Sequence, residues 1–204
     1  MIRRFRKVAA FAVLVPMIFI GGFLLQHGSV SAPSDTSDVV TEEQTPSEAV
    51  MPPAYPEQIR IPKIGVDALF EAPLSVDAQR EIETPEAYET VAYYKHGPTP
   101  GELGPAVVLG HVDSVSGPAV FYSLGQLEEG DTIEIDRDDG TTAVFEVERL
   151  ERHMQSGFPT QKVYGDLDYA GLRLITCSGT YDRGVARYTH NLIVFARLVT
   201  PDSE

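Results

Sequence analysis

The chain has 204 residues and a formal net charge of −14, because 30 acidic side chains outnumber 16 basic ones. A negative excess of this size repels polyanions, which excludes nucleic acid and anionic lipid surfaces as the main partners. The only cysteine, Cys177, cannot form a disulfide within the chain, so its thiol is either an inert core group or a reactive one.

The first predicted element is a membrane-spanning helix. Four basic residues within positions 3–7 precede Val8–Leu25, a run of 18 residues without any charge. At about 1.5 Å per residue this helix spans roughly 27 Å, close to the thickness of a bilayer's hydrocarbon core. The basic residues predict a cytoplasmic tip at 1–7, an uncleaved transmembrane anchor at 8–25 and an extracellular remainder. A cleaved signal peptide is the alternative, because small residues follow at 29–32.

Residues 26–58 form a predicted linker. They are rich in Ser, Thr, Pro and acidic residues and contain few large apolar side chains, so burial cannot offset the entropy lost on ordering them. We expect a disordered acidic tether that leads to one folded domain at 59–200. The length of that domain, about 140 residues, suffices for a single hydrophobic core.

From Ile59 onward, short apolar or alternating runs between turn residues predict a mainly β domain. Ile133 and Ile135 alternate with polar residues, and the turn at Asp138–Gly140 leads to a second alternating run, which predicts a hairpin. Short helices are expected only at 119–127 and 84–89. Seven or eight short strands with so few helices predict a closed or nearly closed β-barrel. The expected strands lie at 59–61, 91–94, 106–109, 131–136, 143–148, 172–176 and 192–198.

Two chemically active residues end apolar strands. Cys177 ends the run LITC, and His111 ends the run PAVVLGH. A thiolate attacks carbonyl carbon, and an imidazole with a pKa of about 6.5 gives and takes protons near neutral pH. The pair therefore fits acyl transfer through a covalent intermediate. No histidine and carboxylate spacing is typical of a metal site, so neither a catalytic metal nor a cofactor is expected.

Six motifs follow one another along the domain: RIPKIGVDA from Arg60, LGHVDS from Leu109, GPAVFYSL from Gly117, GDTIEI from Gly130, LITCSG from Leu174 and NLIVFA from Asn191. In this order they resemble the motifs of the sortases, and they are most similar to the actinobacterial group called class F. The resemblance extends over Ile59–Leu198 and implies an eight-stranded sortase-type barrel with one or two short helices. It also implies a place on the outer face of a Gram-positive cell membrane, where sorting-signal proteins are joined to amines of the cell wall.

The resemblance implies a role for each site residue. Cys177 is the expected nucleophile, His111 its proton partner, and an arginine the donor to the developing oxyanion. The position where many sortases carry that arginine holds Asn191, so the role is assigned to Arg187, four residues earlier, with Arg183 as the alternative. Thr176 and Asn191 are expected to contact the substrate.

The expected function is that of a monomeric, single-pass membrane cysteine transpeptidase. It would cleave an LPxTG-like sorting signal through a thioacyl intermediate and pass the protein to an amine of a cell-wall precursor. One alternative is a cysteine peptidase of similar fold, in which water replaces the amine. The other is an anchored β-barrel binding module in which Cys177 is buried and silent.

Overall fold

The computed structural model describes residues 50–77 and 82–199. The expected cytoplasmic tip, transmembrane helix and most of the linker lie outside the described residues. Within the described part of the chain, no helix has the length and apolar character needed to cross a membrane. The first strand begins at Pro56, three residues before the expected start of the domain at Ile59.

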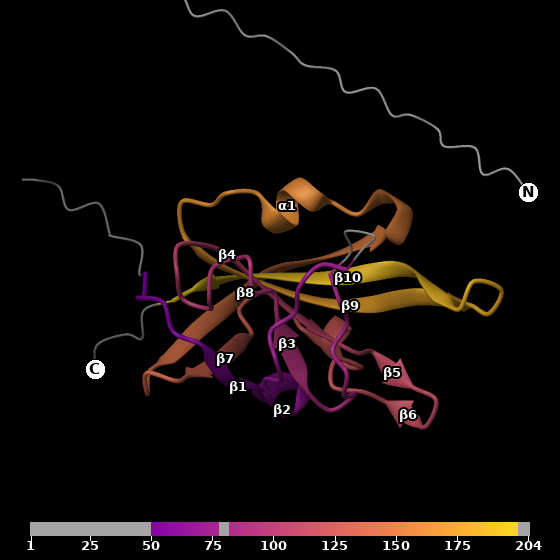
Figure 1. Cartoon of the computed structure of the whole chain (residues 1–204), viewed down its shortest axis with the longest axis horizontal. Coiled ribbons are helices and arrows are strands. Elements are labelled where there is room, and N and C mark those ends of the chain that lie inside the picture. The colour runs from indigo at the N-terminus through magenta and orange to yellow at the C-terminus, as the bar shows by residue number, and fades with distance from the viewer. Residues whose placement is uncertain (1–49, 78–81, 200–204) are drawn as a thin grey trace, which may run out of the picture. The chain divides into compact units, whose positions relative to one another are not determined.

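The domain is built around one eight-stranded sheet that curves into a nearly closed barrel (Figure 1). Among neighbouring strands of this sheet, one pair is parallel, β4 with β9, and the remaining pairs are antiparallel. In spatial order the strands are β2 (Val66–Leu69), β1 (Pro56–Ile61), β7 (Thr132–Arg137), β8 (Thr142–Met154), β10 (Arg187–Leu198), β9 (Ala170–Asp182), β4 (Gly104–Gly110) and β3 (Val91–Tyr93).

The two edge strands of the sheet approach each other where the barrel closes. Phe70, just after β2, forms an isolated parallel bridge with Val91 at the start of β3. The backbone N–H of Glu71 donates to the carbonyl of Val91 at 2.8 Å. Closure of this kind leaves fewer unpaired backbone groups at the sheet edges.

The hairpin expected from the alternating sequence is confirmed, and its apolar side chains fill the barrel. β7 pairs with β8 so that Ile133 lies opposite Phe145 and Ile135 opposite Ala143. All four side chains are fully buried in the main core. Burying a side chain as large as Ile or Phe contributes about 1.5–3 kcal/mol, so this alternation specifies the register.

A second, smaller core lies on the outer face of β4, β9 and β10. The short helix α1 (Thr160–Tyr164), seen above these strands in Figure 1, contributes Val163. Val163 packs with Val107, Ile175, Ile193 and Phe195. Strands covered on both faces read as continuous apolar runs, which accounts for the sequences around His111 and Cys177.

The helices agree only in part with those expected. Only the 3-10 turn η2 (Leu124–Gln126) forms within 119–127, because the N–H of Phe121 donates to the carbonyl of His111 instead of a helical partner. No helix forms at 84–89, where the N–H groups of Glu86 and Ala87 donate to the carboxylate of Glu71. α1 itself, with five residues, is too short to give a periodic pattern.

Three further short elements lie in the loops. The 3-10 turns η1 (Pro62–Ile64) and η3 (Gln155–Gly157) follow β1 and β8. β5 (Asp113–Ser114) and β6 (Gly117–Pro118) pair with each other just after His111.

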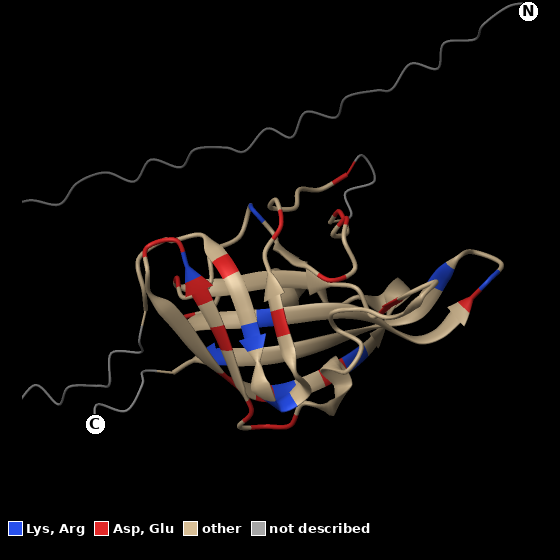
Figure 2. Cartoon of the chain, turned by 90° about the horizontal axis from the view of Figure 1, so that it is seen from below, with Lys and Arg blue, Asp and Glu red and all other residues tan. Residues whose placement is uncertain are grey.

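β9 and β10 continue past the barrel as an exposed two-stranded ribbon (Figure 1). Figure 2 shows charged positions of both signs at the end of this ribbon, where Asp182, Arg183 and Arg187 are exposed. Ala186, in the connecting turn, has a left-handed φ of 53°. This ribbon, Ser178–Asn191, is named the β9–β10 ribbon below.

Candidate active site

The parallel register of β4 and β9 aligns the positions of His111 and Cys177. The last recorded pair is Leu109 with Ile175, and the hydroxyl of Thr176 donates to the carbonyl of Gly110 at 2.8 Å. Extended by two residues past Leu109 and Ile175, the same register aligns position 111, just after β4, with position 177 within β9. Neighbouring strands lie about 4.8 Å apart, so the two residues occupy aligned positions on adjacent strands.

The alternation of side chains sets the face on which this pair lies. Ile175 on β9 and Ile193 on β10 point to the outer core beneath α1. Cys177 and Asn191 lie two residues from them and therefore share this outer face. Asn191 is the direct partner of Cys177 in the β9–β10 ladder. Thr176 instead is buried, and its hydroxyl is engaged with strand β4.

Gly110 fixes the direction of the chain as it enters His111. A Cβ built on this residue would lie 2.5 Å from a ring carbon of Phe121, a separation that side chains do not tolerate. The absence of a side chain lets the buried Phe121 pack against the end of β4, and its N–H donates to the carbonyl of His111 at 2.8 Å. The backbone of His111 is thereby held on the barrel.

The imidazole of His111 is half-buried beneath a loop at 84–90. Its Nε2 lies 2.7 Å from the carbonyl oxygen of Pro85, and the ring of Tyr88 packs on it with centroids 4.7 Å apart. The carbonyl of Tyr88 accepts a hydrogen bond from Val120 at 2.9 Å. The orientation of His111 therefore depends on this loop as well as on β4.

The thiol of Cys177 is half-buried, and its environment disfavours the thiolate. Burial raises the pKa of Cys177, and the negative charge of Asp113 raises this pKa further. The thiol form therefore prevails at neutral pH, and a base must remove the proton when the sulfur reacts.

Asp113 connects the segment after His111 to strand β10. Its carboxylate accepts a hydrogen bond from the hydroxyl of Tyr188, which raises the pKa of Tyr188 to about 12. Tyr188 also packs on Tyr181 across the ribbon, with ring centroids 5.2 Å apart. The sequence analysis missed Asp113 and Tyr188. The only available signal was the position of Asp113, two residues after His111.

The two candidate arginines lie on the β9–β10 ribbon, farther from the barrel than Asn191. Arg187 is paired with Asp182 at the exposed end of the ladder, four residues from Asn191. Arg183 lies in the connecting turn. Between the pairs Tyr188–Tyr181 and His190–Ser178, β9 contains one residue more than β10, which shifts the register. The alternation of β10 continues through this shift, so Arg187 and Asn191 occupy positions of the same parity.

A charged cluster borders the site on the side of β8. His153 lies opposite Asn191 in the ladder and contacts Glu151, which also accepts hydrogen bonds from Arg149 at 3.0 Å and Lys162 at 2.9 Å. Burial alone would raise the pKa of Glu151, but its bonds to Lys162, His153 and Arg149 lower it to about 2. Because Lys162 belongs to α1, this cluster holds α1 against β8.

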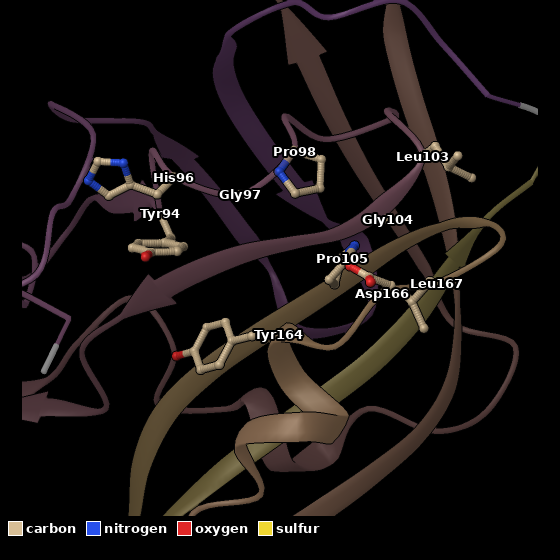
Figure 3. A pocket seen from close by; sticks show the side chains of 10 residues that line it. All are labelled: Tyr94, His96, Gly97, Pro98, Leu103, Gly104, Pro105, Tyr164, Asp166 and Leu167. Carbon is tan, nitrogen blue, oxygen red and sulfur yellow. The ribbon is translucent and has the colours of Figure 1, made fainter. Parts of the chain in front are cut away.

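Two surface hollows lie beside the barrel. One, of about 410 Å³, is lined by the rings of Tyr94 and Tyr164 together with Pro98, Pro105 and Asp166 (Figure 3). It adjoins the start of β4, whereas His111 follows the end of that strand. The other, of about 330 Å³, includes Tyr88 in its wall. Neither His111 nor Cys177 is among the residues that line these two hollows.

No group of three or more His, Cys, Asp or Glu side chains within residues 50–77 and 82–199 is arranged to hold a metal ion.

Comparison with known proteins identifies the family. The sortase domain family matches residues 59–199, and the chain therefore belongs to the sortase family, whose members are in general cysteine transpeptidases. The matched region contains β4, which leads to His111, and β9, which contains Cys177. A search of curated proteins found no match.

Solved structures share the fold at low sequence identity. The sortase D5 transpeptidase of Clostridium perfringens has a TM-score of 0.52 and 20% identity, covering 72% of this chain and 79% of its own. Sortase C-1 of Actinomyces oris has a TM-score of 0.52 and 21% identity, with coverages of 70% and 73%. A lid mutant of sortase A from Corynebacterium diphtheriae has a TM-score of 0.53 and 21% identity, covering 74% of each chain.

Proposed function

We propose that this chain is a membrane-anchored cysteine transpeptidase that cleaves an LPxTG-like sorting signal and transfers the protein to a cell-wall amine. The observation that carries the proposal is the parallel register of β4 and β9, in which the half-buried residues His111 and Cys177 occupy aligned positions. The motifs around both residues favour class F within the sortase family.

In the proposed mechanism Cys177 is the nucleophile. Its sulfur bonds to the carbonyl carbon of the sorting signal's Thr while His111 takes the thiol proton. The C–N bond then breaks, and His111 gives that proton to the departing amine. The incoming amine attacks the thioacyl carbon, the C–S bond breaks, and the amine's proton returns through His111 to the sulfur of Cys177.

Arg187 is proposed as the donor to the oxyanion, with Asn191 and Thr176 at the substrate. Arginine suits the role because its charge is permanent and its donors form a planar fork. The shared parity of Arg187 and Asn191 on β10 supports Arg187 over Arg183. Asn191 lies directly opposite Cys177 in the ladder, and its Oδ1 accepts a hydrogen bond from Gln155 at 3.4 Å. Its side-chain amide is therefore a donor nearer to Cys177 along the ladder than Arg187 is.

The remaining parts of the proposal concern location and partners. The apolar run at 8–25 is proposed as a single transmembrane anchor with its N-terminus in the cytoplasm and the catalytic domain outside. The partners are surface proteins that carry a sorting signal and a cell-wall precursor that supplies the amine. The enzyme is proposed to work as a monomer without a cofactor.

Mass spectrometry of the full-length chain, mixed with a peptide that carries an LPxTG-like motif, tests this function. We expect a mass increase on Cys177 equal to the acyl part of the peptide, and its loss when a glycine peptide is added as the amine. Cys177→Ala is the control that must give no adduct. An unmodified parent chain would contradict the covalent mechanism, and release of free acid alone in the presence of the amine would favour a peptidase.

A further inference from the structure

Glu71 binds three donors of the loop that covers His111. Its Oε1 accepts a hydrogen bond from the backbone N–H of Glu86 at 2.7 Å. Its Oε2 accepts from the N–H of Ala87 at 3.2 Å and from the hydroxyl of Thr90 at 2.7 Å. Glu71 itself is fixed where the barrel closes, because its N–H donates to the carbonyl of Val91 at 2.8 Å. One carboxylate thus ties the loop at 84–90 to the closing edge of the barrel.

This loop supplies the only hydrogen-bond partner recorded for the imidazole of His111 among the described residues. The carbonyl of Pro85, one residue before Glu86, lies 2.7 Å from Nε2 of His111, and Tyr88 packs on the ring. The loop contains neither a helix nor a strand ladder between Thr84 and Glu89. The position of the Pro85 carbonyl therefore depends on contacts such as those of Glu71.

The partner of Nε2 decides where His111 carries its proton. A carbonyl oxygen only accepts hydrogen bonds, so Nε2 must be the protonated nitrogen. A neutral imidazole has one N–H, which leaves Nδ1 as the nitrogen that takes up a proton. When His111 is charged, Nε2 still donates to Pro85, and Nδ1 again holds the proton that can be released.

We propose that Glu71 is a positioning residue that acts on His111 through the loop at 84–90, holding the imidazole in its Nε2–H tautomer so that Nδ1 exchanges protons with the substrate. The inference rests on the proposed function, in which His111 is the proton partner of Cys177. Glu71 does not contact the reacting atoms. Its effect is to present the Pro85 carbonyl to Nε2.

The electrostatic state of Glu71 suits this role. Burial raises its pKa, but the hydrogen bonds from Thr90, Glu86 and Ala87, together with the charge of His111, outweigh burial and lower the pKa overall. Glu71 is therefore a carboxylate at neutral pH, and both oxygens accept. The titratable side chains that interact with His111 are Tyr88, whose ring packs on the imidazole, and Glu71, whose pKa is lowered by the charge of His111.

The test compares Glu71→Ala with Glu86→Gln in the full-length chain kept in detergent. Both variants remove one negative charge from the same region, but Glu86 contributes only its backbone N–H to the contacts of Glu71. The tautomer of His111 is read from its ¹⁵N resonances, which are identified by their loss in His111→Asn. The second readout is kcat/KM for cleavage of the sorting-motif peptide.

We expect Nε2–H to predominate in the parent chain and in Glu86→Gln, and a mixture of tautomers in Glu71→Ala. The same variant should lose about tenfold in kcat/KM, while Glu86→Gln stays within about twofold. An unchanged tautomer in Glu71→Ala would overturn the proposal, even if activity fell. If Glu71→Ala lacks a cooperative thermal transition, Thr90→Val, which removes one of the three donors, decides by the same resonances.

The two readouts separate this inference from the proposed function. A tautomer that changes with Glu71 in a chain that never cleaves the peptide would support the positioning role and overturn the transpeptidase. Normal cleavage together with a tautomer that does not change in Glu71→Ala would support the transpeptidase and overturn the positioning role.

Discussion

β9 and β10 differ on the two sides of Cys177. Toward the barrel, Ala170–Thr176 on β9 and Leu192–Ala196 on β10 are all buried. In the β9–β10 ribbon, Gly179–Arg187 is exposed throughout, and Cys177 and Asn191 at the boundary are half-buried. The same two strands thus pass from a packed core to a ribbon exposed to solvent.

This difference suits the roles proposed for Cys177 and His111. A nucleophile needs a backbone that is held rigidly and a side chain that substrate can reach. The boundary provides both conditions, because the preceding residues are anchored in two cores while the following ones leave the barrel. β4 has the same boundary, since Gly110 is buried and His111 is half-buried.

The largest effect is expected at the boundary itself. Cys177→Ala and His111→Ala should each lower peptide cleavage by at least about 10³-fold, because they remove the proposed nucleophile and its proposed proton partner. The thermal transition should stay within a few degrees, since neither side chain belongs to the buried core. Cleavage assays and thermal unfolding measure both quantities. His96→Ala, an exposed histidine near the start of β4, is the control. More than a few percent activity in Cys177→Ala would rule out the thioacyl intermediate.

The second largest effect is expected in the exposed ribbon, where Arg187 is the proposed oxyanion donor. Arg187→Ala should lower kcat by about 10²–10³, roughly 3–4 kcal/mol, with a smaller change in KM, because an oxyanion donor acts mainly in the transition state. Arg187→Lys should restore little, since an ammonium lacks the planar fork.

Arg183→Ala and Asn191→Ala are the controls for that measurement, because each tests a rival placement of the donor. If Arg187→Ala stays within about threefold of the parent while one control falls a hundredfold, the role belongs to that residue. If that residue is Asn191, the exposed part of the ribbon, Gly179–Arg187, carries no oxyanion donor.

The smallest effect is expected from Asp113, which follows His111 and accepts a hydrogen bond from Tyr188 of the ribbon. Asp113 raises the pKa of Cys177 beyond the effect of burial, so Asp113→Asn should lower this pKa and increase the thiolate fraction at pH 7. Alkylation of Cys177 by iodoacetamide should become about two- to fivefold faster, and its pH profile should move to lower pH. Asp182→Asn, at the exposed end of β9, is the matched control. An equal or slower rate in Asp113→Asn would contradict this role of the carboxylate.

Sequence reasoning succeeded where the determinant is local. Alternation at Ile133 and Ile135 predicted the β7–β8 hairpin, because a period of two specifies which face is buried. The apolar run before His111 predicted the end of β4, which stops at Gly110. The expected end of the other strand at Cys177 was wrong, because β9 continues to Asp182 by pairing with β10. Helices were mispredicted at 119–127 and 84–89, because backbone donors there bind partners distant in sequence, namely His111 and Glu71.

By itself the sequence determined a mainly β domain of the sortase family, the two apolar strands that lead to His111 and Cys177, and the acidic character of the chain. Only the tertiary structure decided that these strands are parallel neighbours, with Thr176 bonded to Gly110 across 66 positions. It also decided that Tyr188 binds Asp113 and that Glu71 holds the loop over His111. The physical reason is that periodicity records which face of a strand is buried, whereas the partners across a barrel depend on how all the strands pack together.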